Sequence, residues 1–278
     1  MQRDPPAGLR QPLLHENGVV IARVVQKNVG ITNYGDTPVF TFCTRAGISA
    51  CMTRIARIVL PGAPHHVTQR GNRRERIFFG DEDYALYRDW LAASCAKFGV
   101  EVWAYCLMPN HVHLILTPAD AAGLGLALSR THRLYAGFVN ARARQTGHLF
   151  QGRFGSVPLD EEHLIAAVRY VALNPVRARL VAKAKDWPHS SARAHLKGRD
   201  DGLVRVRPVL DRVARFADLL ETQADDPAFA ALRRSELIGR PLGSASFTRR
   251  AEALLGRTLA PAKRGPKPKT RPPAPKRG

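Results

Sequence analysis

The sequence has few acidic residues, few cysteines and no long apolar run. Only 23 residues are Asp or Glu, against 43 that are Lys or Arg. The four cysteines form no Cys-x-x-Cys pair, so neither a zinc ribbon nor a zinc finger is expected. The chain also lacks an apolar run of about 18 residues, a signal-peptide pattern and a Gly-x-x-x-x-Gly-Lys phosphate loop. We therefore expect a cytoplasmic protein with no membrane partner and no nucleotide cofactor.

Positive charge is what the sequence has in excess, with a formal net charge of +20. Such an excess of Lys and Arg favours a polyanionic partner, and nucleic acid is the first candidate. Charge indicates partners rather than fold, so a soluble protein with a merely charged surface stays open as the alternative. Hydrophobic residues make up 45% of the chain, which is enough apolar material for a core.

Hydrophobic periodicity predicts an alternation of strands and helices. A helix is expected from an N-cap at Asp81 to Gly99, a second over about 124–144 that Gly147 closes, and a third from a cap at Asp160 to Asn174-Pro175. Strands are predicted at 65–70, 100–107, 111–117 and 154–159. The order β-α-β-β-α-β predicts a ferredoxin-like α+β fold, an antiparallel sheet with helices on one face, followed by one more helix.

The composition changes along the chain and suggests four segments. Residues 1–51 are weakly patterned, and we expect a poorly ordered extension there or a biological start at Met52. Residues 52–195 hold the predicted sheet, and residues 196–258 read as a basic, helical accessory region for DNA binding. Residues 259–278 are rich in Pro, Lys and Arg and contain no acidic residue, so we expect a disordered basic tail.

Two histidines on a predicted strand are the first candidates for a metal site. His111 and His113 are two residues apart, so their side chains point to the same face of the strand. Two imidazoles on one face can ligate one divalent ion. A His-x-His pair alone is a weak signal, since most strand histidines bind no metal.

The third predicted helix carries a tyrosine away from its apolar stripe. At 100° per residue, Tyr170 lies about 200° from the centre of that stripe. Asn174 follows four residues later and shares its face. We therefore expect a phenol and an amide together on the face opposite the core, although an exposed Tyr and a helix-ending Asn-Pro would give the same pattern. The stripe consists of Leu164, Ile165, Val168, Val171 and Ala172.

A tyrosine beside a metal ion suggests phosphoryl-transfer chemistry. The phenol is a poor nucleophile at neutral pH, because its pKa is near 10. A metal ion that polarises a phosphate oxygen would make the phosphorus easier to attack. A covalent phosphotyrosine would conserve the energy of the phosphodiester, so a DNA strand could be cut and rejoined without a nucleotide cofactor.

Four segments together resemble the REP-associated tyrosine transposases, a group of the single-tyrosine HUH transposases of insertion sequences. The resemblance covers roughly residues 52–195, and the motifs occur in the order that the family has. They are His66-Val-Thr-Gln-Arg-Gly-Asn72, Met108-Pro-Asn-His-Val-His113, Gly147-His-Leu-Phe-Gln-Gly-Arg153 and Tyr170-Val-Ala-Leu-Asn-Pro175.

The resemblance implies a role for each matching residue. Tyr170 corresponds to the nucleophile, His111 and His113 to the metal pair, and Asn174 to a further polar metal ligand. It implies Mg²⁺ or Mn²⁺ as cofactor, hairpin-forming palindromic repeat DNA with a single-stranded foot as substrate, and a monomer or homodimer. Candidate DNA-binding residues surround these motifs: Arg70, Asn72, Arg73, Arg74, Arg76, Arg153, Arg177 and Arg179.

Two other functions stay open at this point. A non-catalytic hairpin-binding protein, derived from a transposase, would keep the fold and the arginines but would not need Tyr170. A small-molecule metallohydrolase could use His111 and His113. The charge excess and the lack of a carboxylate near the two histidines disfavour the hydrolase.

Overall fold

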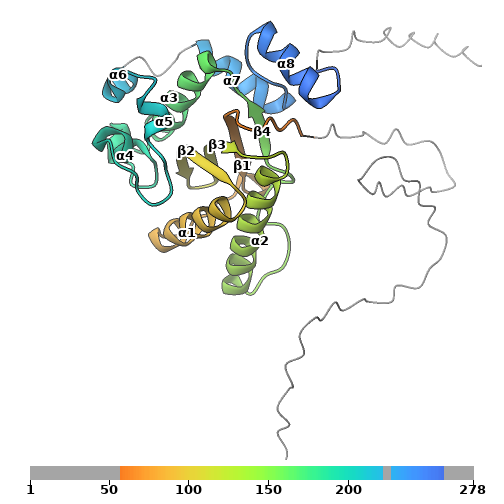
Figure 1. The fold of residues 1–278 in the computed structure, drawn as a ribbon. Helices are drawn as coiled ribbons and strands as arrows, with labels where there is room; N and C mark the ends of the chain where they lie inside the picture. The colour runs from red at the N-terminus through yellow and green to blue at the C-terminus, as the bar shows by residue number, and fades with distance from the viewer. Residues whose placement is uncertain (1–56, 222–226, 260–278) are drawn as a thin grey trace, which may run out of the picture. The chain divides into compact units, whose positions relative to one another are not determined.

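A computed structural model describes residues 57–221 and 227–259 of the chain (Figure 1). The predicted extension over 1–51 and nearly all of the predicted tail over 259–278 lie outside the described residues. None of the helices in the described ranges is long and apolar enough to cross a membrane.

The centre of the fold is a four-stranded antiparallel sheet in the order β2-β3-β1-β4. This is the order of a ferredoxin-like α+β fold, as the sequence predicts. Apolar residues are frequent in two neighbouring strands, at residues 100–108 and 111–118, because both faces of the sheet are covered. The strands are β1 (His65–Arg70), β2 (Val100–Met108), β3 (His111–Pro118) and β4 (Gly155–Pro158).

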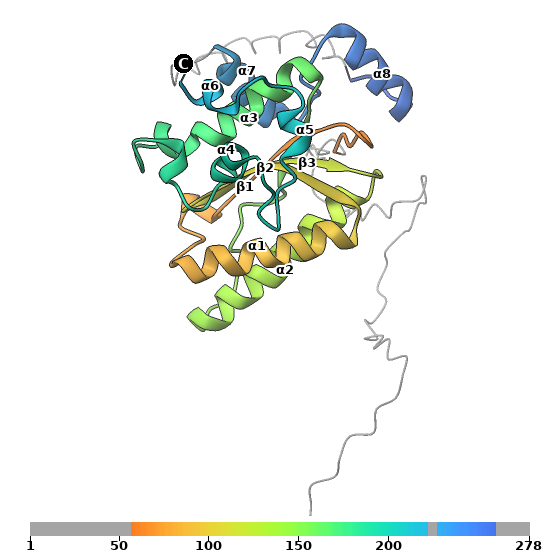
Figure 2. The same cartoon turned by 60° about the vertical axis from the view of Figure 1, so that its left-hand side comes forward.

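Two long helices, α1 (Asp81–Lys97) and α2 (Gly123–Ala143), pack side by side on one face of the sheet (Figure 2). The buried faces of the two helices pack against the side chains on this face of the sheet and form one hydrophobic cluster with them. Residues spaced three or four apart along each helix form these buried faces, as expected from the helical period. Fully buried members include Tyr87, Leu91, Leu128, Tyr135 and Leu114.

The helix α3 (Glu161–Arg177) lies on the other face of the sheet, together with the chain that follows it (Figure 2). Leu164 and Val168 of this helix pack against Ile115 and Val157 of the sheet in a second hydrophobic cluster. Phe229 of α7 is a fully buried member of the same cluster. The following helices are α4 (Ala192–Lys197), α5 (Arg207–Leu210), α6 (Phe216–Glu221), α7 (Pro227–Ile238) and α8 (Ala245–Leu255).

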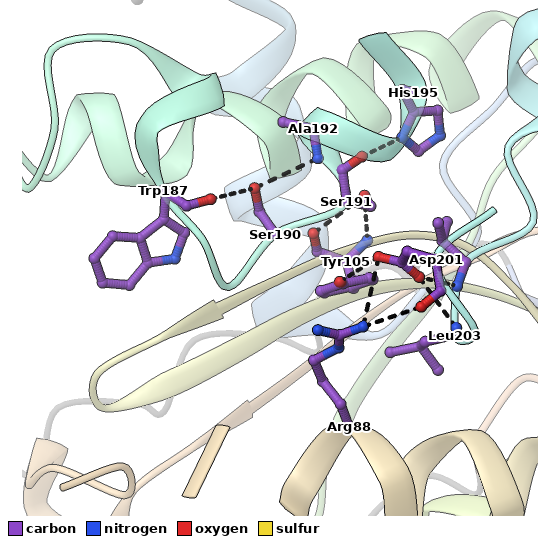
Figure 3. Close-up of polar contacts among 10 residues, drawn as sticks. Arg88, Tyr105, Trp187, Ser190, Ser191, Ala192, His195, Asp201 and Leu203 are labelled. Atoms are coloured by element: carbon purple, nitrogen blue, oxygen red, sulfur yellow. Dashed lines mark hydrogen bonds and ion pairs between the residues drawn. The ribbon is translucent and has the colours of Figure 1, made fainter. Parts of the chain in front are cut away.

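The segment from 187 to 205 covers the open edge of β2 (Figure 3). Ser191 N–H donates to the Tyr105 carbonyl at 2.9 Å, and Tyr105 N–H donates to Ser191 Oγ at 2.9 Å. The Tyr105 hydroxyl donates to Asp201 Oδ2 at 2.6 Å, and Arg88 of α1 donates to the Asp201 carbonyl at 3.2 Å. These contacts satisfy backbone groups of an edge strand that would otherwise be free to pair with another chain.

Three helix ends differ from the sequence prediction. The helix α1 is capped by Gly80, and Asp81 is its first residue. The helix α2 ends at Ala143, and its C-cap Arg144, with a left-handed backbone (φ 51°), takes the role expected of Gly147. The helix α3 continues through Pro175 to Arg177. Pro175 is accommodated near the end of the helix because the missing N–H removes a single backbone bond and the side chain is buried.

Candidate functional site

The sheet face beneath α3 carries three histidines. Alternation along β3 places His111 and His113 on this face, and the antiparallel register sets Arg70 opposite His111 and Thr68 opposite His113. His66 of β1 points to the same face for the same reason. The two histidines that the sequence singles out therefore lie side by side, with ring centroids 4.9 Å apart.

Burial keeps these imidazoles neutral. Burial lowers the pKa of His111 to about 4, with a further contribution from the charge of Arg70. The pKa of His113 is well below its ordinary value, first because of burial and then because of His66, His111 and nearby arginines. Burial alone lowers the pKa of His66 to about 3. Neutral imidazoles have a free lone pair, which is the form that binds metal ions.

Tyr170 faces these histidines from α3. Its ring centroid lies 5.4 Å from that of His113 and 5.8 Å from that of His66, with edge-to-face geometry in both pairs. The side chain is only 5% exposed, which corrects the expectation of a tyrosine on a face away from the core. The reason is tertiary: α7 packs against α3, and Phe229 stands 5.2 Å from the Tyr170 ring.

Charged neighbours act on the Tyr170 hydroxyl in opposite directions. Burial raises the pKa of Tyr170, and the carboxylate of Glu236 raises it further. A hydrogen bond from Arg177 and its positive charge work against that rise. The Arg177 guanidinium also lies over the tyrosine ring, 4.9 Å from its centroid. Arg177 therefore favours the phenolate form, and the charge of Arg233 acts in the same direction.

Asn174 lies one turn after Tyr170 and is 8% exposed. Its Nδ2 is buried and has no hydrogen-bond partner among the described residues. A buried amide N–H without a partner is uncommon and costs free energy. Nδ2 is a hydrogen-bond donor, so this atom cannot itself ligate a metal ion. Two neutral imidazoles can bind a divalent transition-metal ion, and an amide oxygen is a ligand type that suits Mg²⁺ and Mn²⁺, so a set of both is a mixed one.

Glu236 of α7 is the carboxylate at this site that sequence reasoning missed. Its Oε1 lies 3.5 Å from His66 Nδ1, and burial raises the pKa of Glu236 to about 7 against the opposing charges of Arg70, Arg233 and Arg177. Ligand atoms of His66, His113 and Glu236 lie within 4.8 Å of one another. His66 lies on a different strand from His111 and His113. The sequence does not show how the two strands pair, so it could not place His66 beside the other two histidines.

A pocket of about 600 Å³ opens beside the histidines. Three of the predicted DNA-binding residues line it, namely Arg70, Arg74 and Arg153. The other five do not line it: Arg177 covers Tyr170, and the exposed residues Asn72, Arg73, Arg76 and Arg179 lie outside. Its remaining lining residues are Thr68, Gln69, His111, His113, Gln151, Gly155 and Glu236.

A tight turn after β1 presents the arginines. Asn72–Arg74 form a short 3₁₀ turn in which Arg73 and Arg74 both have positive φ, of 52° and 66°. Gly71 enters this turn where an added Cβ would stand 2.2 Å from the carbonyl oxygen of Glu75. Glycine is thus required for the chain to turn back so closely, and the turn directs Arg74 into the pocket.

Comparison with known proteins finds transposases. Residues 62–174 match the family described as IS200-like transposases. Within the class, a protein of Haemophilus influenzae named as a REP-associated tyrosine transposase is 24% identical over 122 residues. The match covers 40% of this chain and 69% of that protein. The resemblance to REP-associated tyrosine transposases is confirmed.

Two solved structures are also similar to the chain. One is described as a REP-associated tyrosine transposase bound to a REP hairpin; it has 19% identity and a TM-score of 0.45, and the match covers 63% of this chain and 94% of that one. The other, described as a transposase candidate from Deinococcus radiodurans, has 18% identity and a TM-score of 0.31, over 42% of this chain and 95% of that one.

Proposed function

We propose that the protein is a transposase-type nuclease that cuts and rejoins single-stranded DNA at hairpin-forming repeats, with Tyr170 as nucleophile. The observation that carries the proposal is the position of Tyr170, whose ring lies 5.4 Å from that of His113, and His113 lines a pocket together with three arginines. The family of residues 62–174 supports DNA cleavage and strand transfer as the reaction class.

The reaction follows from the groups at the site. The Tyr170 oxygen attacks a phosphodiester phosphorus, a phosphorus–oxygen bond to the sugar breaks, and a 3′-hydroxyl leaves with a proton. The phenol proton passes to solvent as the 5′-phosphotyrosine forms. Arg177 favours the phenolate, because its hydrogen bond and charge lower the pKa that burial raises. Attack by a sugar hydroxyl on the phosphotyrosine reverses these steps and rejoins a strand.

A divalent metal fits beside the tyrosine. We propose that His111, His113 and Asn174 hold Mg²⁺ or Mn²⁺, which would polarise a non-bridging phosphate oxygen and offset charge in the transition state. The neutral imidazoles of His111 and His113 support this assignment, and the side-chain oxygen of Asn174 would be the third ligand atom. Arg70, Arg74 and Arg153 line the pocket and would neutralise phosphates of the bound strand.

Four other predicted DNA-binding residues lie outside the pocket. Asn72, Arg73, Arg76 and Arg179 are exposed, and we propose that they contact the hairpin outside the pocket. The covering of Tyr170 by Phe229 favours a second candidate, a hairpin-binding protein that does not cut. Such a protein would keep its affinity for DNA without any use for the Tyr170 hydroxyl.

A denaturing gel separates the two candidates. Protein and Mn²⁺ are mixed with a labelled hairpin repeat from DNA that flanks the gene. The wild type should form an adduct that survives denaturation, and Tyr170→Phe or a chelator should abolish it. Tyr84→Phe is the matched control, because Tyr84 stacks on Phe78 and His189 away from the site. If the wild type retards the hairpin on a native gel but forms no adduct, the binding protein is the correct function.

A further inference from the structure

A carboxylate and two imidazoles stand in a row that ends at the proposed metal site. Glu236 Oε1 of α7 lies 3.5 Å from His66 Nδ1 of β1. The other nitrogen of that ring, His66 Nε2, lies 3.0 Å from His113 Nδ1 of β3. The two imidazole rings are nearly parallel, with 8° between their planes and 5.2 Å between their centroids. The row joins three elements that are far apart in the sequence.

Among the described residues, the two atoms that face each other at the start of the row have no hydrogen-bond partner. The His66 side chain is fully buried, and its Nδ1 makes no hydrogen bond within the described part of the chain. Glu236 Oε1 is buried and likewise has none there. A separation of 3.5 Å is long for a hydrogen bond, and a shift of a few tenths of an ångström would close it. His66 Nδ1 and Glu236 Oε1 are thus within reach of each other, and leaving both atoms unpaired would cost free energy.

The row determines where each imidazole carries its proton. Above its pKa of about 7, the Glu236 carboxylate is ionised and only accepts hydrogen bonds, so His66 must then carry its proton on Nδ1 to satisfy it. The lone pair of His66 is then on Nε2, which can only accept from His113 Nδ1. His113 therefore carries its proton on Nδ1, and its own lone pair is on Nε2. In the opposite arrangement His113 Nε2 would carry a proton and could not ligate a cation.

We propose that Glu236 and His66 are positioning residues, which hold His113 in the tautomer that offers Nε2 to the divalent cation. The proposal rests on the proposed metal site of His111 and His113 but assigns new roles to two residues outside it. Carboxylate–histidine pairs behind a metal ligand typically contribute 10–100-fold to metal affinity. The helix α7, beyond the family-matched residues, would then be a working part of the site.

The tautomers can be read directly in the metal-free protein. Long-range ¹H–¹⁵N spectra of histidine side chains distinguish a protonated ring nitrogen from one with a free lone pair. At pH 8 we expect both His66 and His113 to show a protonated Nδ1 and a free Nε2, with signals assigned from His66→Ala and His113→Ala. A His113 that carries its proton on Nε2 would overturn the proposal.

Metal binding without DNA tests the order of the row. Binding of Mn²⁺ is measured by the electron-paramagnetic-resonance signal of the free ion. Glu236→Gln, whose amide can accept or donate and so selects no tautomer, should weaken Mn²⁺ binding about 10-fold or more, as should His66→Ala. Because Glu236 acts through His66, the double variant should be no weaker than His66→Ala alone. Glu221→Gln, an exposed carboxylate at the end of α6, is the matched control.

The outcomes separate this inference from the proposed function. If Glu236 and His66 were themselves ligands, the losses of the two single variants would multiply in the double variant, and the positioning role would be wrong. If the protein shows the expected tautomers and non-additive losses but forms no covalent DNA adduct, the positioning role of Glu236 and His66 is supported and the proposed nuclease function is wrong. If the protein forms the adduct but the losses of Mn²⁺ affinity multiply in the double variant, the nuclease function is supported and only the positioning role is wrong.

Discussion

At the scale of single residues, Asp160 controls how the tyrosine helix begins. Its Oδ1 accepts from the backbone N–H of His163 at 3.0 Å and from His163 Nδ1 at 2.7 Å. Its Oδ2 accepts from the backbone N–H of Ser244 at 2.8 Å, just before α8. The side chain is 12% exposed, so these bonds are partly shielded from water. One carboxylate therefore caps α3 and fixes the start of α8.

We expect Asp160→Ala to lower the free energy of unfolding by about 1–2 kcal/mol at pH 7, since an N-cap is lost. Asp160→Asn should cost less than half as much, because an amide oxygen still accepts from His163. Urea unfolding followed by tryptophan fluorescence measures both. Equal losses in the two variants would mean that the cap contributes nothing beyond the charge.

The same carboxylate predicts a pH dependence. Burial alone would raise the pKa of Asp160, but hydrogen bonds from His163 and Ser244 outweigh it and lower the pKa below the ordinary 3.8. A carboxyl with a lowered folded-state pKa stabilises the protein above pH 3.8 and loses that contribution as the pH falls through the folded value. The advantage of wild type over Asp160→Asn should thus be constant near neutral pH and shrink as the pH falls below 3.8, and an unchanged advantage there would contradict the lowered pKa.

The sequence could predict those parts of the site that depend on the spacing of residues within one strand or helix. The spacing of His111 and His113 is enough to place both on one face, because alternation is a property of one strand. His66 reaches them through the pairing of β1 with β3, and Glu236 reaches them through the packing of α7. No local pattern encodes either contact, so both residues were missed.

At the scale of elements, the two faces of α3 are buried by different partners. The sheet covers one face, which the apolar stripe predicted correctly. The face with Tyr170 and Asn174 is polar enough to suggest solvent, but Tyr170 contacts the sheet histidines on one side and Phe229 of α7 on another. A helix that is covered on both sides by tertiary contacts cannot be recognised from its own amphipathic pattern. The strand and helix order was predictable because it rests on periodicity within each element.

The packing of α7 on α3 should depend on Phe229. This fully buried ring contacts Tyr170, and the guanidinium groups of Arg169 and Arg177 both lie 5.3 Å from its centroid. We expect Phe229→Leu to weaken the docking of α7 by about 1 kcal/mol, through loss of the ring contacts. Amide hydrogen exchange in α7 should then be roughly fivefold faster, with α1 and α2 unaffected.

Phe78→Leu provides the matched control for that measurement. Phe78 is equally buried but belongs to the cluster on the opposite face, where it stacks on Tyr84. It should speed exchange on the side of α1 and leave α7 as in the wild type. If both variants accelerate α7 equally, then α7 opens only when the whole protein unfolds, and Phe229 has no special role in holding it.

At the scale of the whole molecule, composition predicted the class of partner but could not locate its site. A net charge of +20 attracts DNA wherever the charge lies, so charge alone does not single out any arginine. The fold does so, because the turn after β1 and the chain before β4 bring Arg70, Arg74 and Arg153 to one pocket. The contribution of each arginine to DNA binding should therefore differ with its place.

The salt dependence of hairpin binding measures that difference. The logarithm of the binding constant falls with the logarithm of the salt concentration, with a slope of roughly −0.7 to −0.9 per neutralised phosphate. Arg70→Gln, Arg74→Gln and Arg153→Gln should each weaken binding and make the slope shallower by about 1. Arg133→Gln is the control, since Arg133 is exposed on α2, across the sheet from the site. If that variant changes the slope as much as the other three, net charge alone holds the DNA and the pocket is not the path of the strand.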